Sequence, residues 1–228
     1  TGMAVEDIGI YTVNSDGNVE HVKTVESEDE YDMVYRKDDW DAKEYYGARI
    51  RVDDQSILSQ LSGISTSYIS GGRLVKYADG NAGQLFRLFK YVADNTQVEW
   101  TIIQGTIDGE FKTRIGTSHY SNAAPNPFTM GFDEGGLSLD MHSHRNHEGR
   151  STNMVDEKRS MGMGANGQPL NDATYDWHVY ESYRNTNKGD LKYQVYFAAS
   201  QRLYQVKYGK GPVYVKSIQN SNDFIFRR

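Results

Sequence analysis

The sequence contains no cysteine, and it has no apolar run long enough to cross a membrane as a helix. Without cysteine the chain cannot build a disulfide scaffold, a thiolate metal site or a cysteine nucleophile. Positive charge is also scarce, since 25 Lys and Arg residues stand against 31 Asp and Glu residues and the formal net charge is −6. A protein that coats nucleic acid needs clustered basic residues, so that class of function is disfavoured.

Apolar residues make up only 37% of the 228 residues, but 17 tyrosines and 8 phenylalanines can add buried area to a core. The length suits one ordinary domain, or one domain with an extension. The chain starts with Thr1 rather than methionine, which indicates a processed piece of a longer protein. No signal-peptide pattern follows, so we expect any export signal to lie outside these residues.

The first part of the chain is predicted to form strands separated by polar segments. The expected elements are a hairpin of residues 8–13 and 19–25, a strand over 45–52, and a helix over 54–61 capped by Asp53 or Asp54. The acidic stretch of residues 26–44 is typical of a solvated loop. Residues 62–72 are rich in Ser and Gly, which favours a boundary between a β-rich acidic extension, residues 1–70, and a second domain, residues 71–228.

The second part combines one clear helix with many short strands. Leu85, Leu88, Phe89 and Val92 recur at helical spacing, and Asp79 or Asn81 can start that helix. The expected strands are residues 98–103, 111–117, 137–142, 174–183, 192–198, 202–208 and 213–218. The pattern predicts an α+β fold, in which a mostly antiparallel sheet is flanked by helices.

A metal site is suggested by His142-Ser143-His144. Residues i and i+2 of a strand point to one face, so both imidazoles can reach one ion. Asn153 is a plausible helix N-cap, and that helix would aim Asp156 of its first turn back at the strand end. Two histidines and one carboxylate form a three-ligand set that leaves a fourth position for water, as catalytic zinc requires.

Such a site also needs a proton acceptor, and Glu99 is the odd residue in the apolar run of residues 98–103. An acidic side chain in that position lies either on the solvent face of an edge strand or at a functional site. Held near the metal, its carboxylate could take a proton from water and relay it to a leaving group.

The order Glu99, His142-Ser143-His144 and a polar residue three before Asp156 resembles the JAB/MPN metallopeptidase family, also called JAMM. Its motif is a glutamate on a strand, a distant His-Ser/Thr-His, and Ser-x-x-Asp at a helix start. More narrowly, residues 140–144 and 95–100 are similar to the JAB-like toxin domains of polymorphic and Rhs-type bacterial effectors. The resemblance covers roughly residues 71–208.

The resemblance implies a cytidine-deaminase-like core, Zn²⁺ as cofactor, and hydrolysis of a peptide or isopeptide bond in a protein substrate. It also implies a secreted or delivered effector, with an immunity protein as a candidate partner. The family serine, which helps to hold the oxyanion, falls on Asn153, and Ser151 is the alternative. Arg145 replaces the usual proline after the second histidine, and the spacing to Asp156 is one residue longer than usual.

Two other functions stay open. A metal-dependent nuclease would also use a histidine cluster, and an inactive JAMM-like domain that only binds a partner would explain Asn153 and Arg145. His147 is an alternative metal ligand, whereas His119 and His178 are expected to be ordinary sheet residues. Residues 162–167 resemble a phosphate loop, but no Lys-Ser/Thr follows them, and a plain loop is expected.

Overall fold

The computed structural model describes residues 6–63, 67–70, 73–144, 154–163, 176–187, 191–207, 210–220 and 223. Within these ranges the chain forms two sheets and five helices, and most strand pairs are antiparallel. The predicted α+β class is confirmed. None of the described helices is long and apolar enough to cross a membrane.

The smaller sheet has the strand order β2-β1-β3-β4 and precedes the rest of the fold in the sequence. Its strands are β1 (Glu6–Val13), β2 (Val19–Ser27), β3 (Asp32–Arg36) and β4 (Arg49–Val52). The predicted hairpin is confirmed, because β1 and β2 pair antiparallel, while β3 joins β1 in parallel. Two short helices follow its strands: α1 (Lys37–Asp41) and α2 (Gln55–Ser62). Asp54 is the N-cap of α2 and accepts a hydrogen bond from the Ser56 backbone.

The prediction of a solvated loop over residues 26–44 is wrong for residues 32–41, which form β3 and α1. Asp32 and Asp39, only 2% and 4% exposed, are the reason. The Gly9 backbone N–H donates to Asp32 at 2.9 Å, and the Ala48 N–H donates to Asp39 at 3.1 Å. These carboxylates are buried hydrogen-bond acceptors, which a count of charges along the chain cannot distinguish from solvated ones.

The larger sheet has eight strands in the order β12-β11-β10-β9-β7-β8-β6-β5. Its strands are β5 (Ser67–Ser70), β6 (Arg73–Asp79), β7 (Trp100–Ile107), β8 (Glu110–Thr117), β9 (Leu137–His144), β10 (Lys192–Phe197), β11 (Arg202–Lys207) and β12 (Gly211–Ser217). Only β9 and β10 pair in parallel, at the centre of the sheet. β9 therefore has a neighbour on each side, and the residues at its end are enclosed.

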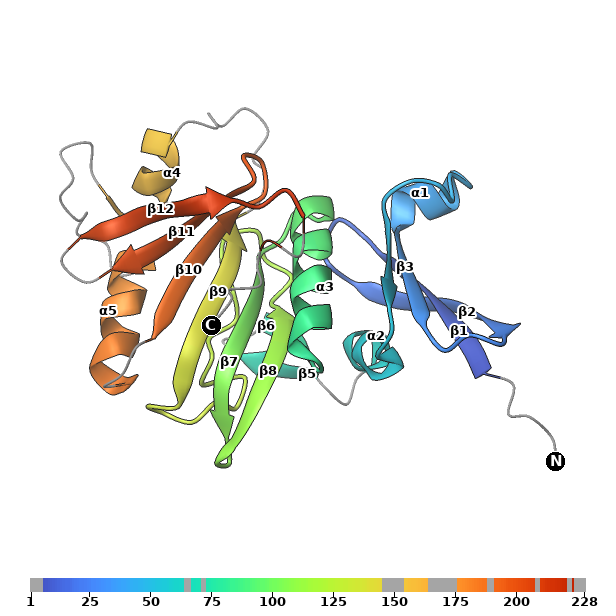
Figure 1. Ribbon diagram of the computed structural model, residues 1–228, viewed down its shortest axis with the longest axis horizontal. Helices are drawn as coiled ribbons and strands as arrows, with labels where there is room; N and C mark the ends of the chain where they lie inside the picture. The colour runs from blue at the N-terminus through green and yellow to red at the C-terminus, as the bar shows by residue number, and fades with distance from the viewer. Residues whose placement is uncertain are drawn as a thin grey trace.

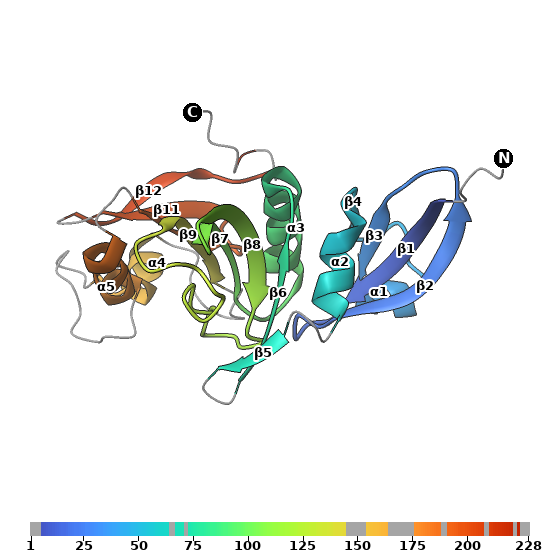
Figure 2. The same ribbon diagram turned by 90° about the horizontal axis from the view of Figure 1, so that it is seen from below.

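Helices cover both faces of this sheet (Figures 1 and 2). Helix α3 (Ala82–Asn95) lies on one face, between the large sheet and the N-terminal sheet. Helices α4 (Met154–Ser160) and α5 (Asp176–Asn187) lie on the other face. The core around α3 is continuous from the N-terminal sheet to the large sheet. The division at residue 70 stays a prediction, and apolar packing crosses it.

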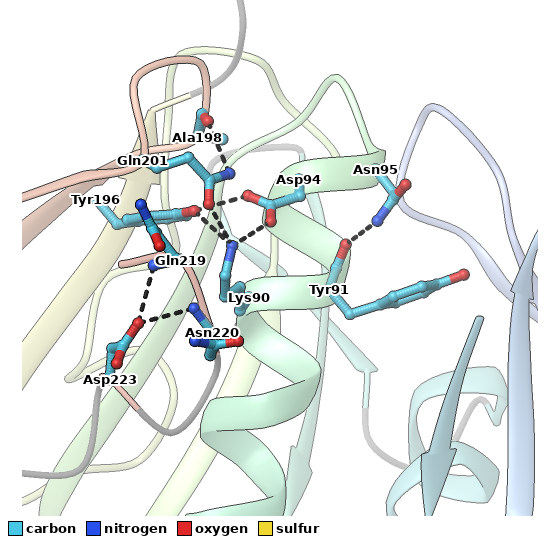
Figure 3. A network of polar contacts seen from close by, with 10 residues as sticks. All are labelled: Lys90, Tyr91, Asp94, Asn95, Tyr196, Ala198, Gln201, Gln219, Asn220 and Asp223. Carbon is cyan, nitrogen blue, oxygen red and sulfur yellow. Dashed lines mark hydrogen bonds and ion pairs between the residues drawn. The ribbon is translucent and has the colours of Figure 1, made fainter. Parts of the chain in front are cut away.

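The predicted amphipathic helix is confirmed as α3. Asn81 caps it by accepting hydrogen bonds from Gly83 and Gln84, and the predicted apolar stripe is buried. Its C-terminal half is tied to the sheet through Lys90, which is only 8% exposed. The Lys90 ammonium lies 2.6 Å from Asp94 and 3.1 Å from the Tyr196 hydroxyl of β10 (Figure 3). This buried cation is fully partnered, and it fixes α3 against the sheet.

The prediction of a strand over residues 174–183 is wrong, because α5 starts at Asp176 and continues beyond that range. Asp176, Tyr180 and Tyr183 are all buried, at the i, i+4 and i+7 spacing of one helix face. The abundance of tyrosine suggested a strand, but the spacing of the buried residues is helical. His178 is thus a helix residue, and His119 lies in the loop after β8, so neither is in the sheet.

The turn between β1 and β2 packs against the segment that precedes β7. The Gln97 N–H donates to the Ser15 carbonyl at 2.7 Å, and the His119 ring contacts the Asp16 carbonyl at 2.8 Å. Gly17 in this turn is buried and has a φ of +75°. A Cβ atom there would lie 2.7 Å from Val98 Cγ2. Glycine is required both by the backbone conformation and by the close approach.

We expect Gly17→Ala to destabilise the protein by about 3 kcal/mol, through backbone strain and displacement of Val98. Gly109→Ala is the matched control, since Gly109 has a φ of +78° and nothing lies within 4 Å of its added Cβ. Gly109→Ala introduces only the backbone strain of a positive φ, and it should lower the free energy of unfolding by about 1 kcal/mol. Denaturant unfolding of both variants measures the difference. Equal losses would mean that the turn does not pack against residue 98 in solution.

Candidate metal centre

The C-terminal half of strand β9 presents two histidines and an aspartate to the α5 side of the sheet, and two apolar residues to the α3 side. Leu139 and Met141 belong to the core around α3. Asp140, His142 and His144 alternate with them and therefore face the other way. His142 is 4% exposed, and its ring centroid lies 5.2 Å from that of His144. The prediction that both imidazoles share one face is confirmed.

Asp176, the first residue of α5, lies between the two imidazoles. His142 Nε2 is 3.0 Å from Asp176 Oδ1, and His144 Nε2 is 3.2 Å from Asp176 Oδ2. One ligand atom from each of the three residues lies within 4.8 Å of the others, which makes them a group that could hold a metal ion. The carboxylate is buried, at 8% exposure.

The described chain does not bring Asp156 into this group. Asp156 lies in the first turn of α4, as predicted, and it is exposed. Its assignment as a metal ligand stays a prediction. The other residues that the sequence suggested in this stretch lie outside the described residues: Arg145, His147, Ser151 and Asn153.

Glu99 lies immediately before β7, on the same face of the sheet as the histidines. Thr101 pairs with His142 in the antiparallel register of β7 and β9, so Glu99 extends that register toward His144. It is only 8% exposed, and the idea that it lies on a solvent face is therefore wrong.

Backbone hydrogen bonds fix the segment around Glu99 from both sides. The Glu99 N–H donates to the Tyr120 carbonyl at 2.8 Å, and the Thr117 hydroxyl donates to the Glu99 carbonyl at 2.9 Å. The Trp100 N–H donates to the hydroxyl of Ser143, the residue between the two histidines, at 3.0 Å. The Ala124 N–H also donates to the Glu99 carboxylate. The acid and the histidine strand are thus held in one rigid register.

Burial raises the pKa of Glu99 above its usual value, against the opposing pull of His144 and His142. Burial would likewise raise the pKa of Asp176, but the two imidazoles outweigh it and hold that pKa far below its usual range. For His142, burial favours the neutral form, yet Asp176 outweighs it and raises the pKa to about 9. Asp140, fully buried beside them, has a pKa raised by burial to about 6.

The donor set fits a divalent metal ion such as zinc. Two imidazole nitrogens and a carboxylate oxygen are ligands of known catalytic zinc sites. Among the described residues, Asp176 Oδ2 is buried without a hydrogen-bond partner, although His144 lies within ion-pair distance. A buried carboxylate oxygen with no donor is a costly arrangement in a pocket of histidines, and a bound cation would satisfy it.

Reasoning from the sequence missed Asp176, although two signals could have found it. The helical spacing from Asp176 to Tyr180 and Tyr183 makes Asp176 the start of a buried helix face. The family motif also requires its aspartate at a helix start, and Asp176 opens α5. The residue three before it is Ala173, which has no hydroxyl group.

The fold and the site define an α+β protein with a candidate His-His-Asp metal centre. Residues 77–193, just over half of the chain, match the family described as JAB-like toxin 1, and the chain belongs to that family. In comparisons with curated proteins and with solved structures, the chain matches none of them. The matched range contains the whole metal group and Glu99, whereas the N-terminal sheet precedes it.

Membership of a JAB-like toxin family implies a metal-dependent hydrolase. The expected resemblance to JAB-like toxin domains is thereby confirmed.

Proposed function

We propose that this chain is a zinc-dependent peptidase or isopeptidase of JAMM type, acting as the toxin domain of a secreted or delivered bacterial effector. The observation that carries the proposal is the convergence of His142, His144 and Asp176, with buried Glu99 on the same face of the sheet. A zinc ion bound there would supply Lewis-acid activation of water and of a carbonyl oxygen.

The chain itself supplies the proton transfer and the positioning. Glu99 takes a proton from the attacking water and later gives it to the leaving amine. Its raised pKa suits both roles, because a carboxyl group with a pKa nearer to neutrality both accepts and returns a proton more readily. His142 and His144 would hold the metal from one strand, and Ser143 between them ties that strand to the Glu99 segment.

The oxyanion donor has two candidates in the sequence. Asn153 and Ser151 are the proposed donors, and an asparagine amide can donate a hydrogen bond as a serine hydroxyl does. If Asp176 is the aspartate of the family motif, the serine position falls on Ala173, which cannot donate. This departure favours the second candidate function, a JAMM-like domain that binds a partner without cleaving it.

Two aspartates compete for the role of third ligand, and paired substitutions separate them. The buried position of Asp176 between the imidazoles supports it as the ligand, whereas Asp156 is exposed. We expect Asp176→Asn to lower zinc affinity by about a hundredfold, since an amide is a much weaker ligand for zinc than a carboxylate. Asp156→Asn should leave zinc affinity unchanged. Titration against a chromophoric chelator measures both, and the opposite ranking would assign the ligand to Asp156.

The function is tested on the purified full chain by metal analysis, a peptide-library cleavage assay and a nucleic-acid cleavage assay. Zinc together with metal-dependent peptide cleavage is the expected result. Bound metal with nucleic-acid cleavage would replace the proposal by a nuclease toxin. Bound metal with neither activity would favour the binding domain, and a chain that takes up no metal would overturn the proposal.

A further inference from the structure

Two hydroxyl groups that belong to no family motif lie behind the proposed metal ligands. The Tyr193 hydroxyl, on β10, lies 3.4 Å from Asp176 Oδ1. The Ser160 hydroxyl, at the end of α4, lies 3.5 Å from His144 Nδ1. His144 Nδ1 is the ring nitrogen that does not face Asp176, whereas Asp176 Oδ1 also faces His142 Nε2. Hydrogen bonds of this kind orient ligands and set their protonation in metal sites.

Tyr193 is held rigidly where it meets Asp176. It is 3% exposed, it pairs with Asp140 in the parallel register of β10 and β9, and its ring packs against His142 with centroids 5.6 Å apart. Its hydroxyl donates to Oδ1, which also lies 3.0 Å from His142 Nε2. Oδ2 faces His144 Nε2 at 3.2 Å. The Tyr193 hydroxyl therefore fixes the rotation of the carboxylate, so that each of its oxygens faces one imidazole.

The contact of Ser160 with His144 defines a tautomer. A serine hydroxyl has one proton, and that of Ser160 goes to the Glu157 carbonyl, at 2.8 Å. The oxygen can then only accept from His144, so Nδ1 of that imidazole carries the proton. In the neutral ring the lone pair is left on Nε2, the atom that faces Asp176.

Helix α4 is fixed to the sheet by a buried acid that the proposed catalysis does not use. Glu157 is 4% exposed, and its carboxylate accepts from the Tyr204 hydroxyl at 2.5 Å and from Arg202 at 3.2 Å. Met161, at the end of the same helix, is fully buried in the core on this face of the sheet. These contacts hold the last turn of α4, and with it Ser160, beside His144.

We infer that Tyr193 and Ser160 are positioning residues for the metal ligands, Tyr193 by orienting the Asp176 carboxylate and Ser160 by fixing the tautomer of His144. The inference rests on the proposed metal site. It gives α4 a role in the site through Ser160 and the Nδ1 side of His144, whereas Asp156 of the same helix is exposed.

The test measures Zn²⁺ affinity of the full chain by competition with a chromophoric chelator. Tyr193→Phe and Ser160→Ala should each lower the affinity about ten- to hundredfold, the usual effect of losing such a partner. Ser160→Thr keeps the hydroxyl group and should bind zinc with wild-type affinity. If Ser160 only packed the helix, the presence of a hydroxyl group would not matter for zinc affinity. Thermal unfolding of each metal-free variant, compared with that of the wild type, shows that the fold is intact.

The chain offers matched controls for both changes. Tyr91→Phe also removes a hydroxyl that makes a hydrogen bond, to the Ala48 carbonyl at 2.8 Å, but on the far side of α3. Ser59→Ala removes a helical hydroxyl that donates to the carbonyl three residues earlier, as Ser160 does. Neither control should change zinc affinity.

The outcomes separate this inference from the proposed function. If the wild type binds zinc and the zinc affinity of both variants is within twofold of the wild-type value, the inference is wrong. The proposed metal site then still stands. If zinc affinity falls in only one of the two variants, the residue replaced in the other variant has no positioning role. A wild type that binds no zinc overturns the proposed function and this inference together.

Discussion

Glu99→Gln is expected to leave zinc binding intact while peptide cleavage falls by about a hundredfold or more, the usual contribution of a positioned general base. The substitution keeps the shape of the side chain and removes its capacity to accept a proton. Glu99 is buried on the face of the two histidines, so no solvent-exposed role competes with this one. Because its pKa is raised, cleavage by the wild type should also decline as the pH falls through that pKa.

Expression in bacteria offers a direct measurement of the same change. The wild type should inhibit growth, and the Glu99→Gln protein should be harmless at equal solubility and zinc content. Glu110→Gln is the control, since Glu110 is exposed at the start of β8 and pairs with Lys112. Equal toxicity of wild type and Glu99→Gln would remove Glu99 from the mechanism, and with it most of the case for a peptidase.

His142→Ala is expected to abolish stoichiometric zinc binding, because it removes the most buried ligand of the three-residue group. His21→Ala is the matched control, as His21 lies exposed on β2, where its ring contacts Thr24 and Tyr11 and no proposed ligand. Elemental analysis of the purified proteins gives the zinc content. Full zinc content in His142→Ala would place the metal elsewhere, with His147 as the first alternative.

The same site predicts how zinc affinity depends on pH. In the metal-free protein Asp176 raises the pKa of His142 to about 9, so the imidazole is mostly protonated at neutral pH. A metal must displace that proton, and binding therefore releases protons. We expect zinc affinity to rise with pH up to about 9 and to fall steadily on acidification. An affinity that does not change between pH 6 and pH 8 (on the order of one proton per metal is expected to be released) would contradict the assignment of His142.

Local patterns predicted the elements on which the site is built. The spacing of Leu85, Leu88 and Phe89 and the cap at Asn81 identified α3, because a helix buries one stripe and needs a donor-satisfying residue at its start. The alternation in β9 placed His142 and His144 on one face for an equally local reason. Acids were harder to interpret. The charge pattern around Asp32 and Asp39 is that of a solvated segment. Both carboxylates are buried because backbone N–H groups from elsewhere in the chain donate hydrogen bonds to them.

The sequence by itself determined that any metal site must use imidazole and carboxylate, since there is no cysteine, and that two histidines of one strand would supply part of it. It also determined the family resemblance, through two short motifs, residues 95–100 and 140–144. The tertiary structure alone decided which acids join them. Glu99 reaches the site through the pairing of β7 with β9, and Asp176 reaches it because α5 packs back across the sheet. Those contacts depend on long-range pairing and burial, whose energies come from residues far apart in the chain. A local pattern can place Asp176 on a buried helix face, but it cannot say which strand that face meets.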